Sequence, residues 1–489
     1  MFKQRKVLSS ILVVAMVALL ITSLTSTPTN AWWIFGEDSQ EESQVKTKQT
    51  NKQPKYVFLF IGDGMAASQR QLASYFLKAK TGNQDAQLTM NKLPVGGMNT
   101  TYASNTLVTD SAAAGTALAT GYKTNKGMIG QLPNGTSVRT IIEAAEAKGM
   151  GTGVISTMRL THATPASFLA HNESRYNPNQ IAEDIAQSNV DFLAGGGYRH
   201  FIPKTAKKSE RKDNKNLVKV FKDKDYKTFV GDPQGFRAYK PKKGDKVFAP
   251  LTASHLPYEL DRNPNTTPSL AEITQKGINT LVKHDNGFVM MVEGGRIDYA
   301  GHANSPATVA NDVLAFDKAV QKAYRFYKKH PKETLIVVTG DHETGGLGLG
   351  FKNNYFLNID KLLPIKSSLD QLNYTGDRKA FFTSLKKDYG LTNLTAKEKA
   401  KIEKAMNLAD AGKKLVNYMP GWMSPVNAMV AKIVSARAGL FWTTYAHTGT
   451  AVPLTAAGVG ANNFSGYKDN TQVAKEMANL LDLKLTNLK

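Results

Sequence analysis

The chain of 489 residues contains no cysteine, which excludes disulfides and metal sites built on thiolates. A metal ion in this protein must therefore be held by histidine, carboxylate or hydroxyl groups, which suit cations such as Mg²⁺ and Zn²⁺. Glycine and proline are at ordinary levels and hydrophobic residues make up 41% of the sequence, which excludes a disordered chain. The length is sufficient for one large domain or for two to three ordinary ones.

Long apolar runs are absent after the N-terminus. Residues 1–31 have the pattern of a bacterial-type signal peptide, with a basic start, an apolar core over 11–21 and small residues before Ala31. The apolar core is shorter than a comfortable bilayer span, which favours a cleaved signal over a retained anchor. We expect residues 32–53, which are mostly polar, to form a flexible linker, and the mature protein to be secreted or associated with the cell envelope.

Acidic residues are outnumbered by basic ones, and the formal net charge is +22. A charge of this sign attracts anionic substrates, anionic wall polymers and nucleic acid alike. The densest basic stretch, residues 204–227, is polar with few interleaved aromatic residues, which favours a solvated insertion over a polyanion contact. We therefore expect association with the anionic cell envelope and no specific binding of nucleic acid.

Apolar runs typical of buried strands alternate with helical patterns along most of the chain. The run 56–61 is followed by Gly62-Asp63-Gly64, which predicts a parallel strand whose carboxyl end presents Asp63. The other expected strands cover 151–156, 191–194, 287–292 and 334–339, and helices are expected over 69–78, 138–147, 180–187, from 267–268 onward, after Ser305 and over 471–481. This alternation predicts an α/β fold, a mostly parallel central sheet with helices on both faces.

Two segments interrupt this alternation. Residues 198–265 are expected to be irregular with short strands, and residues 352–440 combine Tyr, Lys, Pro and Gly with short helical pieces. We interpret both as insertions in one domain spanning 54–489, the second forming a cap or crown that covers a functional site or makes a subunit contact.

The polar pair Asp110-Ser111 precedes a run of small residues that ends at Ala117. A helix beginning at Ser111 would direct its free N–H groups and the positive end of its dipole at a phosphate, which the hydroxyl would be positioned to attack. Taken alone, the pattern is more typical of an ordinary helix cap. Metal-ligand groupings elsewhere in the chain favour the catalytic interpretation.

Acidic residues and histidines recur at or just after predicted strand ends. Asp298 and His302 are four residues apart, which places them on one side of a helical turn. The full set is Asp63, Asp110, Glu293, Asp298, His302, Asp341 and His342. In a parallel sheet these side chains would converge at one edge. His447 also lies in a glycine-containing turn, whereas His200, His255, His284 and His330 have polar neighbours and are expected at the surface.

Six motifs in this chain resemble those of the alkaline phosphatase family of secreted two-zinc phosphomonoesterases. They are IGDGM at 61–65, TDSAAAGTA at 109–117, HATPASFLAHNESR at 162–175, VEGGRIDYAGH at 292–302, VTGDHETGG at 338–346 and HTGT at 447–450. The resemblance covers most of 55–350 and 445–470, and the two interrupting segments match nothing in it.

The resemblance implies a role for each motif residue. Ser111 would be the nucleophile that becomes phosphorylated, Arg175 would clamp the phosphate oxygens and Asp110 would orient Arg175. The implied ligands are Asp298, His302 and His447 for one Zn²⁺, Asp63, Asp341 and His342 for a second Zn²⁺, and Asp63, Thr164 and Glu293 for a Mg²⁺. Two cations about 4 Å apart suit phosphoryl transfer, which needs positive charge on the transferred group.

Two positions depart from the best-known bacterial pattern. His162 stands where that pattern has an aspartate near the third metal, and Tyr299 occupies a position at which relatives vary. Both leave the identity and affinity of the third metal open. His171, in the same motif as His162, is expected to be structural.

Two alternatives remain from the residues alone. A phosphodiesterase or sulfatase of the same superfamily would share the metal ligands, although the Asp110, Ser111 and Arg175 set favours a monoester with two free oxygens. A non-enzymatic exported protein that binds polyanions would not need all of the ligand positions filled, as they are here. A homodimer is a further expectation.

Overall fold

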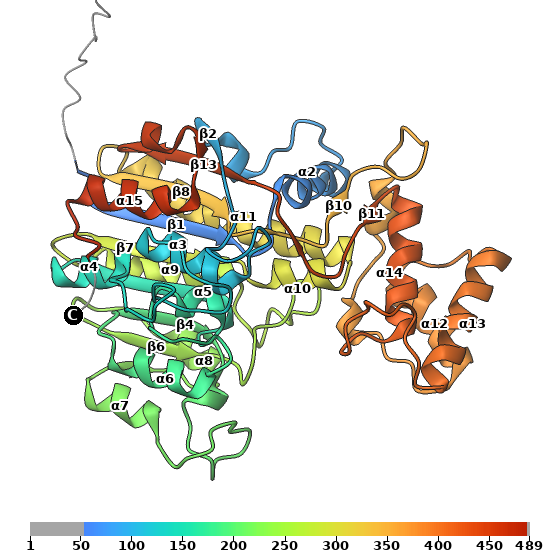
Figure 1. Ribbon diagram of the computed structural model, residues 1–489, viewed down its shortest axis with the longest axis horizontal. Coiled ribbons are helices and arrows are strands. Elements are labelled where there is room, and N and C mark those ends of the chain that lie inside the picture. Colours follow the sequence, from blue (N-terminus) through green and yellow to red (C-terminus); the bar gives the residue numbers. More distant parts are fainter. Residues whose placement is uncertain (1–52, 487–489) are drawn as a thin grey trace, which may run out of the picture. The chain divides into compact units, whose positions relative to one another are not determined.

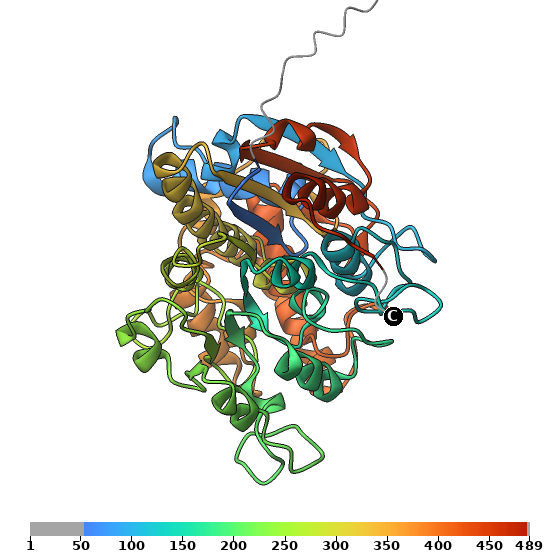
Figure 2. The ribbon, with the colours of Figure 1, turned by 90° about the vertical axis from the view of Figure 1, so that its left-hand side faces the viewer.

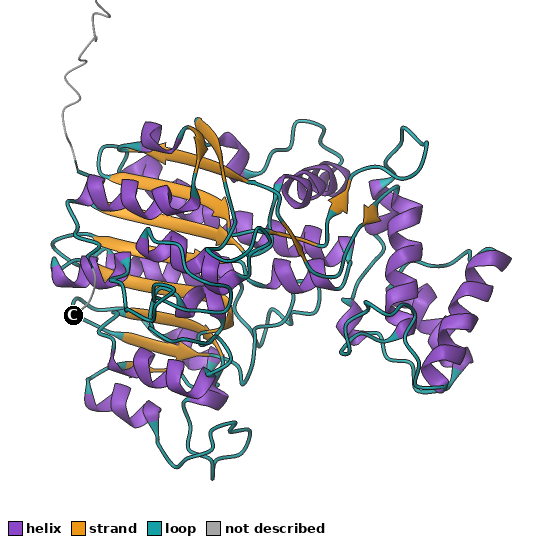
Figure 3. Ribbon diagram, in the orientation of Figure 1, coloured by secondary structure: helices purple, strands orange, loops and turns teal. Residues whose placement is uncertain are grey.

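The computed structural model describes residues 53–486. The predicted signal peptide and almost all of the predicted linker lie outside these residues. At the centre is a ten-stranded sheet in the order β14-β2-β13-β8-β1-β7-β3-β4-β6-β5 (Figures 1 and 3). In that order the strands are Gly466–Lys468, Val95–Asn99, Val452–Gly458, Thr334–Gly340, Tyr56–Gly62, Phe288–Glu293, Gly151–Arg159, Phe192–Gly196, Val247–Pro250 and Lys227–Thr228. Within this sheet β13 alone runs antiparallel to its neighbours, so the predicted mostly parallel α/β fold is confirmed.

Both faces of the sheet are apolar, and β1 shows why. Tyr56, Phe58 and Phe60 point into one hydrophobic core, and the alternate residues Val57, Leu59 and Ile61 point into the other. This is the side-chain alternation of a strand buried on both sides, and it explains the continuous apolar run in the sequence.

Helices cover the two faces (Figure 2). The core that contains Phe58 includes side chains of α2 (Ala67–Thr81), α9 (Leu270–Leu281) and α11 (Pro306–Lys329). The opposite core includes side chains of α3 (Ser111–Thr120), α4 (Ile141–Ala147), α5 (Ala163–Ala166), α6 (Pro178–Gln187) and α15 (Asn470–Leu481). Local signals set where several helices begin: Ser269 caps α9 in a capping box with Glu272, one or two residues later than the predicted start.

The segment 198–265 is more ordered than predicted. It contains α7 (Leu217–Asp223) and α8 (Pro233–Ala238), and it supplies β5 and β6, the last two strands at one edge of the sheet. This segment is therefore an integral part of the sheet and not only a surface insertion. Short strands were predicted here, but their place in the central sheet was not, because β5 has only two residues and β6 four, too few for a periodicity to be recognised.

The segment 352–440 forms full helices in place of the predicted short pieces. These are α12 (Arg378–Asp388), α13 (Ala396–Asp410) and α14 (Pro425–Ala438). They lie away from the central sheet, on the right-hand side in Figure 1. Two short antiparallel strand pairs join this region to the core: β10 (Leu347–Gly348) pairs with β11 (Phe441–Trp442), and β9 (Glu343–Thr344) pairs with β12 (His447–Thr448). Among residues 53–486, no helix has both the length and the hydropathy of a membrane span.

Candidate active site

The neighbouring strands β8, β1, β7 and β3 bring the predicted acidic residues to one edge of the sheet. Gly62 of β1 is in register with Gly340 of β8, so the next residues, Asp63 and Asp341, leave adjacent strands side by side. Ile61 is in register with Glu293 at the end of β7. The carboxyl ends of these parallel strands therefore form the floor of the site, as the strand pattern predicts.

Ser111 is the first residue of α3, and Asp110 is its N-cap. The Asp110 carboxylate accepts a hydrogen bond from the backbone N–H of Ala113 at 3.1 Å. Ser111 is 1% exposed, and its Oγ lies 3.2 Å from Nε2 of His342. The hydroxyl thus lies at the positive end of a helix and beside a histidine that follows the end of β8.

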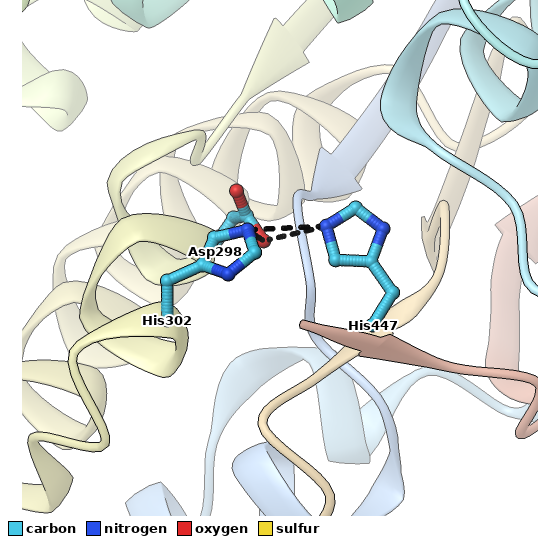
Figure 4. Close-up of side chains that lie close together, drawn as sticks. All are labelled: Asp298, His302 and His447. Atoms are coloured by element: carbon cyan, nitrogen blue, oxygen red, sulfur yellow. Dashed lines mark hydrogen bonds and ion pairs between the residues drawn. The ribbon is translucent and has the colours of Figure 1, made fainter. Parts of the chain in front are cut away.

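Asp298, His302 and His447 form the first group of potential metal ligands (Figure 4). Asp298 and His302 lie on α10 (Arg296–His302), one helical turn apart, and His447 comes from β12. The Nε2 atoms of His302 and His447 lie 3.4 and 3.5 Å from Oδ1 of Asp298. These three atoms can share one cation, although the residues come from two distant segments of the chain.

Backbone carbonyls orient both histidine rings of this group. Nδ1 of His302 lies 2.6 Å from the carbonyl oxygen of Tyr445, and Nδ1 of His447 lies 2.9 Å from that of Thr109. A proton on each Nδ1 leaves each Nε2 free as a ligand, which is the outer contact usual for metal-binding histidines. Burial opposes a charge on His302, but the adjacent Asp298 carboxylate raises the pKa of His302 to about 9.

Asp63, Asp341 and His342 form the second group, and all three are fully buried or 1% exposed. Nε2 of His342 lies 3.3 Å from Oδ1 of Asp63 and 3.4 Å from Oδ2 of Asp341. Oδ1 of Asp341 accepts hydrogen bonds from the backbone N–H groups of Gly64 and His342, at 3.0 and 2.9 Å. Oδ2 of Asp341 and both carboxylate oxygens of Asp63 have no hydrogen-bond donor among the described residues.

The third group contains Asp63, His162 and Glu293, and Thr164 follows His162 by two residues. Ser156 donates a hydrogen bond to Oε2 of Glu293, whereas Oε1 of Glu293 has no partner in the described part of the chain. Oγ1 of Thr164 and Nδ1 of His162 are likewise buried without a described partner. Asp63 therefore belongs to two groups, the second and the third.

The electrostatics of the second and third groups favour the binding of cations. Burial, followed by the charges of Asp341, Asp298 and Glu293, raises the pKa of Asp63 well above its usual range. Burial is also the main cause that raises the pKa of Asp341 to about 7 and that of Glu293 to about 8. Carboxylates packed together in a dry site need cations or protons to compensate them.

Arg175 faces these groups across the mouth of the site. Its Nη1 donates a hydrogen bond to Oδ2 of Asp110 at 2.9 Å, and its Nη2 lies 3.3 Å from Nε2 of His162. The backbone N–H of Arg175 donates to the carbonyl of Gly127 at 2.8 Å. The guanidinium is thus held by one carboxylate, and Arg175 is part of the lining of the cleft.

A cleft of about 800 Å³ connects Ser111 and Arg175 with the solvent. Its lining includes residues that the sequence did not single out, among them Lys126, Tyr258, Arg296, Asp370 and Trp422. Asp370 and Trp422 come from the segment 352–440, so this segment does form part of the wall of the site, as expected of a cap.

The predicted surface location is wrong for His200, and His255 is half-buried in the lining of the cleft. The His255 ring lies 5.7 Å from that of His162 and 5.1 Å from that of Tyr299, measured between ring centroids, inside the cleft lining. His200 is 2% exposed and lies away from the cleft, with Nδ1 3.0 Å from the side-chain oxygen of Asn179. The only sequence signal was the apolar Leu256 and Tyr258 after His255, both of which are buried.

His171 contacts none of these groups. Its two ring nitrogens lie 2.7 Å from the Gly130 carbonyl and 2.8 Å from the Glu143 carboxylate, so it ties the 162–175 segment to α4. This agrees with the structural role expected from the sequence.

Comparisons with known proteins agree with this geometry. The profile of the alkaline phosphatase family matches residues 54–483. Alkaline phosphatase 3 of Bacillus subtilis (strain 168) is 33% identical over 461 residues, covering 92% of this chain and 94% of that protein. The repressible alkaline phosphatase of Saccharomyces cerevisiae is 31% identical, covering 91% of this chain and 84% of that protein.

Solved structures give the same result. The cold-active alkaline phosphatase of a psychrophilic Shewanella species superposes with a TM-score of 0.74 at 32% identity, covering 87% of this chain and 99% of that one. The Thermus thermophilus alkaline phosphatase superposes with a TM-score of 0.77 at 27% identity, covering 91% of this chain and 96% of that one. With its ten-stranded sheet and its grouped carboxylates and histidines, the chain belongs to the alkaline phosphatase family of phosphate monoester hydrolases.

Proposed function

We propose that this protein hydrolyses phosphate monoesters through a phosphoserine intermediate at Ser111, at a site that holds two Zn²⁺ ions and one Mg²⁺ ion. The observation that carries the proposal is the position of the Ser111 hydroxyl. It lies at the N-terminus of a buried helix, 3.2 Å from His342, beside three groups of side chains whose oxygen and nitrogen atoms can each surround a cation.

The donor atoms fit this set of metals. The first group offers two imidazole nitrogens and a carboxylate, and the second offers one imidazole and two carboxylates, both of which suit catalytic Zn²⁺. The third offers Asp63, Glu293 and the Thr164 hydroxyl, an oxygen set that suits Mg²⁺. The buried oxygens without partners on Asp63, Asp341, Glu293 and Thr164 are the atoms that such cations would satisfy.

The residues of the chain would divide the reaction between them. Arg175 would bind two non-bridging oxygens of the phosphate through its planar guanidinium, and Asp110 would hold Arg175 in that orientation. The oxygen Oγ of Ser111 would attack phosphorus in line with the ester bond, which breaks and releases the alcohol. Water would then attack the phosphoserine, form inorganic phosphate and restore the serine.

The cations, when bound, would supply positive charge to the transferred phosphoryl group and lower the pKa of the attacking hydroxyl and water. The N-terminal N–H groups of α3 would add to this charge from the side of the protein. The first histidine group would stay in place through its contacts with the Tyr445 and Thr109 carbonyls.

His162 makes the third site different from an all-oxygen site. Its buried Nδ1 has no described partner and its Nε2 faces Arg175, so this member of the third group also contacts the proposed phosphate clamp. In the alkaline phosphatase of the Antarctic bacterium TAB5, variants with a histidine replaced by Glu or Asp were solved with Mg bound in the M3 site. We propose that the third site of this chain holds Mg²⁺ weakly, because an imidazole is a poorer ligand for Mg²⁺ than a carboxylate.

Parallel assays test the proposed function. The purified protein should hydrolyse an aryl phosphate monoester at least about a hundredfold faster than the corresponding diester or sulfate, because Arg175 needs two free phosphate oxygens. Chelation should abolish this activity, and metal analysis should give two zinc ions per chain. Preference for the diester or the sulfate would replace the proposal by one of the alternative activities.

The cellular setting is a separate proposal. The N-terminal pattern over 1–31 supports export, and the net charge of +22 supports association with an anionic cell envelope. We also propose a homodimer. Fractionation of cells, release from envelopes by salt, and sedimentation of the purified protein test these three points in turn.

A further inference from the structure

A second cavity, of about 560 Å³, lies outside the active site between α13, α14 and strand β11. In Figure 1, α14 stands between β11 and α13. Apolar side chains form most of its wall, including Leu408, Leu415, Met429, Ile433, Leu440 and Trp442. A cavity of this size and lining is in the range that binds small organic molecules.

The charged groups around this cavity are almost all positive. Lys401, Lys404 and Lys432 line it, and none of the three forms an ion pair with another described residue. The one carboxylate in the lining, Glu398, is held by Nε and Nη2 of Arg437 at 2.8 and 2.7 Å, and this ion pair lowers the pKa of Glu398 to about 2. Its charge is therefore compensated within the protein, and three lysine charges remain for a ligand.

We propose that this cavity is an effector site for a single-chain amphipathic anion, such as a medium-chain fatty-acid carboxylate. The acyl chain would lie among the leucine, methionine and tryptophan side chains, and the carboxylate would contact the three lysines. The apolar wall calls for an apolar chain, and the unpaired lysines select an anionic head group over a neutral or cationic one.

The inner end of the cavity borders the backbone that carries the first metal group. The ring of Trp442 covers Gly345, where a β-carbon would lie 2.5 Å from the ring, and the N–H of Gly345 donates to the carbonyl of Ala446 at 2.8 Å. Ala446 precedes His447 directly. A ligand that shifts Trp442 would therefore act on the segment that positions His447.

Asn304 connects the cavity wall to the other histidine of the first group, His302, which precedes it by two residues. Asn304 lines the cavity, and its side-chain nitrogen, in the orientation that satisfies its neighbours, donates to the carbonyls of Gly301 and Thr444 at 2.9 and 3.0 Å. Both histidines of the first group thus have a neighbour in the cavity wall. The effector role rests on the proposed function, whereas binding to the cavity does not.

Calorimetric titration of the metal-loaded protein with dodecanoate, below its micelle concentration, tests the site. We expect saturable binding that excess inorganic phosphate does not displace, and no comparable binding of acetate or of dodecyltrimethylammonium. Lys432→Glu should weaken binding at least tenfold. Lys397→Glu, which changes the same charge at an exposed position of α13 outside the cavity, should leave it unchanged.

The effector role is measured as turnover of an aryl phosphate with and without dodecanoate. We expect at least a twofold change in kcat or KM that is lost in Lys432→Glu and kept in Lys397→Glu. Absence of saturable binding, or equal binding by both variants, would overturn the site itself. Binding without any change in turnover would overturn the effector role, and a change in dimerisation with unaltered dodecanoate binding in Lys432→Glu would identify the cavity as an interface between copies.

Discussion

One carboxylate, that of Asp110, links the helix that carries Ser111 to the guanidinium of Arg175. Its Oδ1 accepts hydrogen bonds from the backbone N–H groups of Ala113 and Gly127, both at 3.1 Å, and its Oδ2 accepts one from Nη1 of Arg175 at 2.9 Å. The position of the proposed phosphate clamp is thus fixed relative to the proposed nucleophile through a single side chain.

The substitution Asp110→Asn should keep the contacts of this side chain with the backbone and weaken its contact with Arg175. Asparagine is a good N-cap, so the start of α3 should survive and the melting temperature should change little. Loss of the charged hydrogen bond to Arg175 should weaken binding of inorganic phosphate about tenfold and raise KM for a monoester by a similar factor. Asp469→Asn, at the cap of α15 and outside the cleft lining, is the matched control. An unchanged KM in Asp110→Asn would contradict the clamp.

Ser111→Ala removes the proposed nucleophile. We expect turnover to fall at least about a thousandfold, with metal content unchanged, since some direct attack by water can persist. Mass spectrometry of acid-quenched enzyme should detect phosphoserine in the parent protein and not in the variant. Ser104→Ala, at an exposed position, should behave as the parent. Full activity of Ser111→Ala with intact metal would remove the serine from the mechanism.

Removal of the metals should lower activity and stability together. The buried carboxylates of Asp63, Asp341 and Glu293 lie close to one another, and without cations the pKa values of all three are raised because their charged forms are penalised. A cation at a thousandfold excess over its Kd stabilises the folded state by about 4 kcal/mol. Thermal melts and assays during zinc and then magnesium addition measure this, and an apo-protein of full activity would refute the metal site.

His162→Asp tests the third site. Replacing a buried imidazole by a carboxylate should tighten Mg²⁺ at least about tenfold, since Mg²⁺ prefers oxygen ligands. Inorganic phosphate should also bind more tightly and leave more slowly, which lowers kcat if release limits turnover. Magnesium titrations of both proteins give the answer. An identical Mg²⁺ dependence would place His162 outside the site and leave Thr164 and Glu293 as the ligands.

Glu146, on α4 away from the active site, gives stability a dependence on pH. Burial, followed by the charges of Asp191 and Glu143, raises the pKa of Glu146 to about 7. Since the unfolded value is near 4.3, the folded protein binds more protons than the unfolded one between the two values, so Glu146 makes stability fall as pH rises from about 4 to about 7.

Glu146→Gln should remove this penalty. Above pH 7 the variant should be more stable than the parent by about 1–2 kcal/mol, a figure that allows for partial solvent screening, and the gain should shrink toward pH 5. Urea unfolding at several pH values, at constant metal concentration, measures the difference. Glu333→Gln, at an exposed position, should show no such trend, and a pH-independent difference for Glu146→Gln would disprove the assignment.

The floor of the site follows from the sequence because strand ends in a parallel sheet converge. The apolar runs before Asp63, Glu293 and Asp341 predicted the strands, and the register of β1 with β7 and β8 then brings the three carboxylates together. Short-range spacing also predicted the Asp298–His302 pair, which lies on α10.

The residues that form the walls of the site could not be predicted from strand ends in this way. His255 lines the cleft because β6 joins the sheet and returns the following loop to the cleft, a consequence of tertiary pairing that its polar neighbours do not reveal. The helices of 352–440 could have been predicted from the sequence. Thr395 and Glu398 form a capping box at the start of α13, and Ser424-Pro425 begins α14; both patterns are recognisable in the sequence. The frequent glycine, proline and tyrosine residues around them obscured these signals.

The pairing of β12 with β9 has a consequence for how the protein matures. His447 joins Asp298 and His302 only after β12 has paired with β9, and it lies more than 380 residues along the chain from Asp63. A ribosome must therefore finish nearly the whole polypeptide before the first cation position has all three donors. The first group of potential ligands is therefore completed last during synthesis, and a chain truncated before His447 would keep β1, β7 and β8 yet lack one donor of that group.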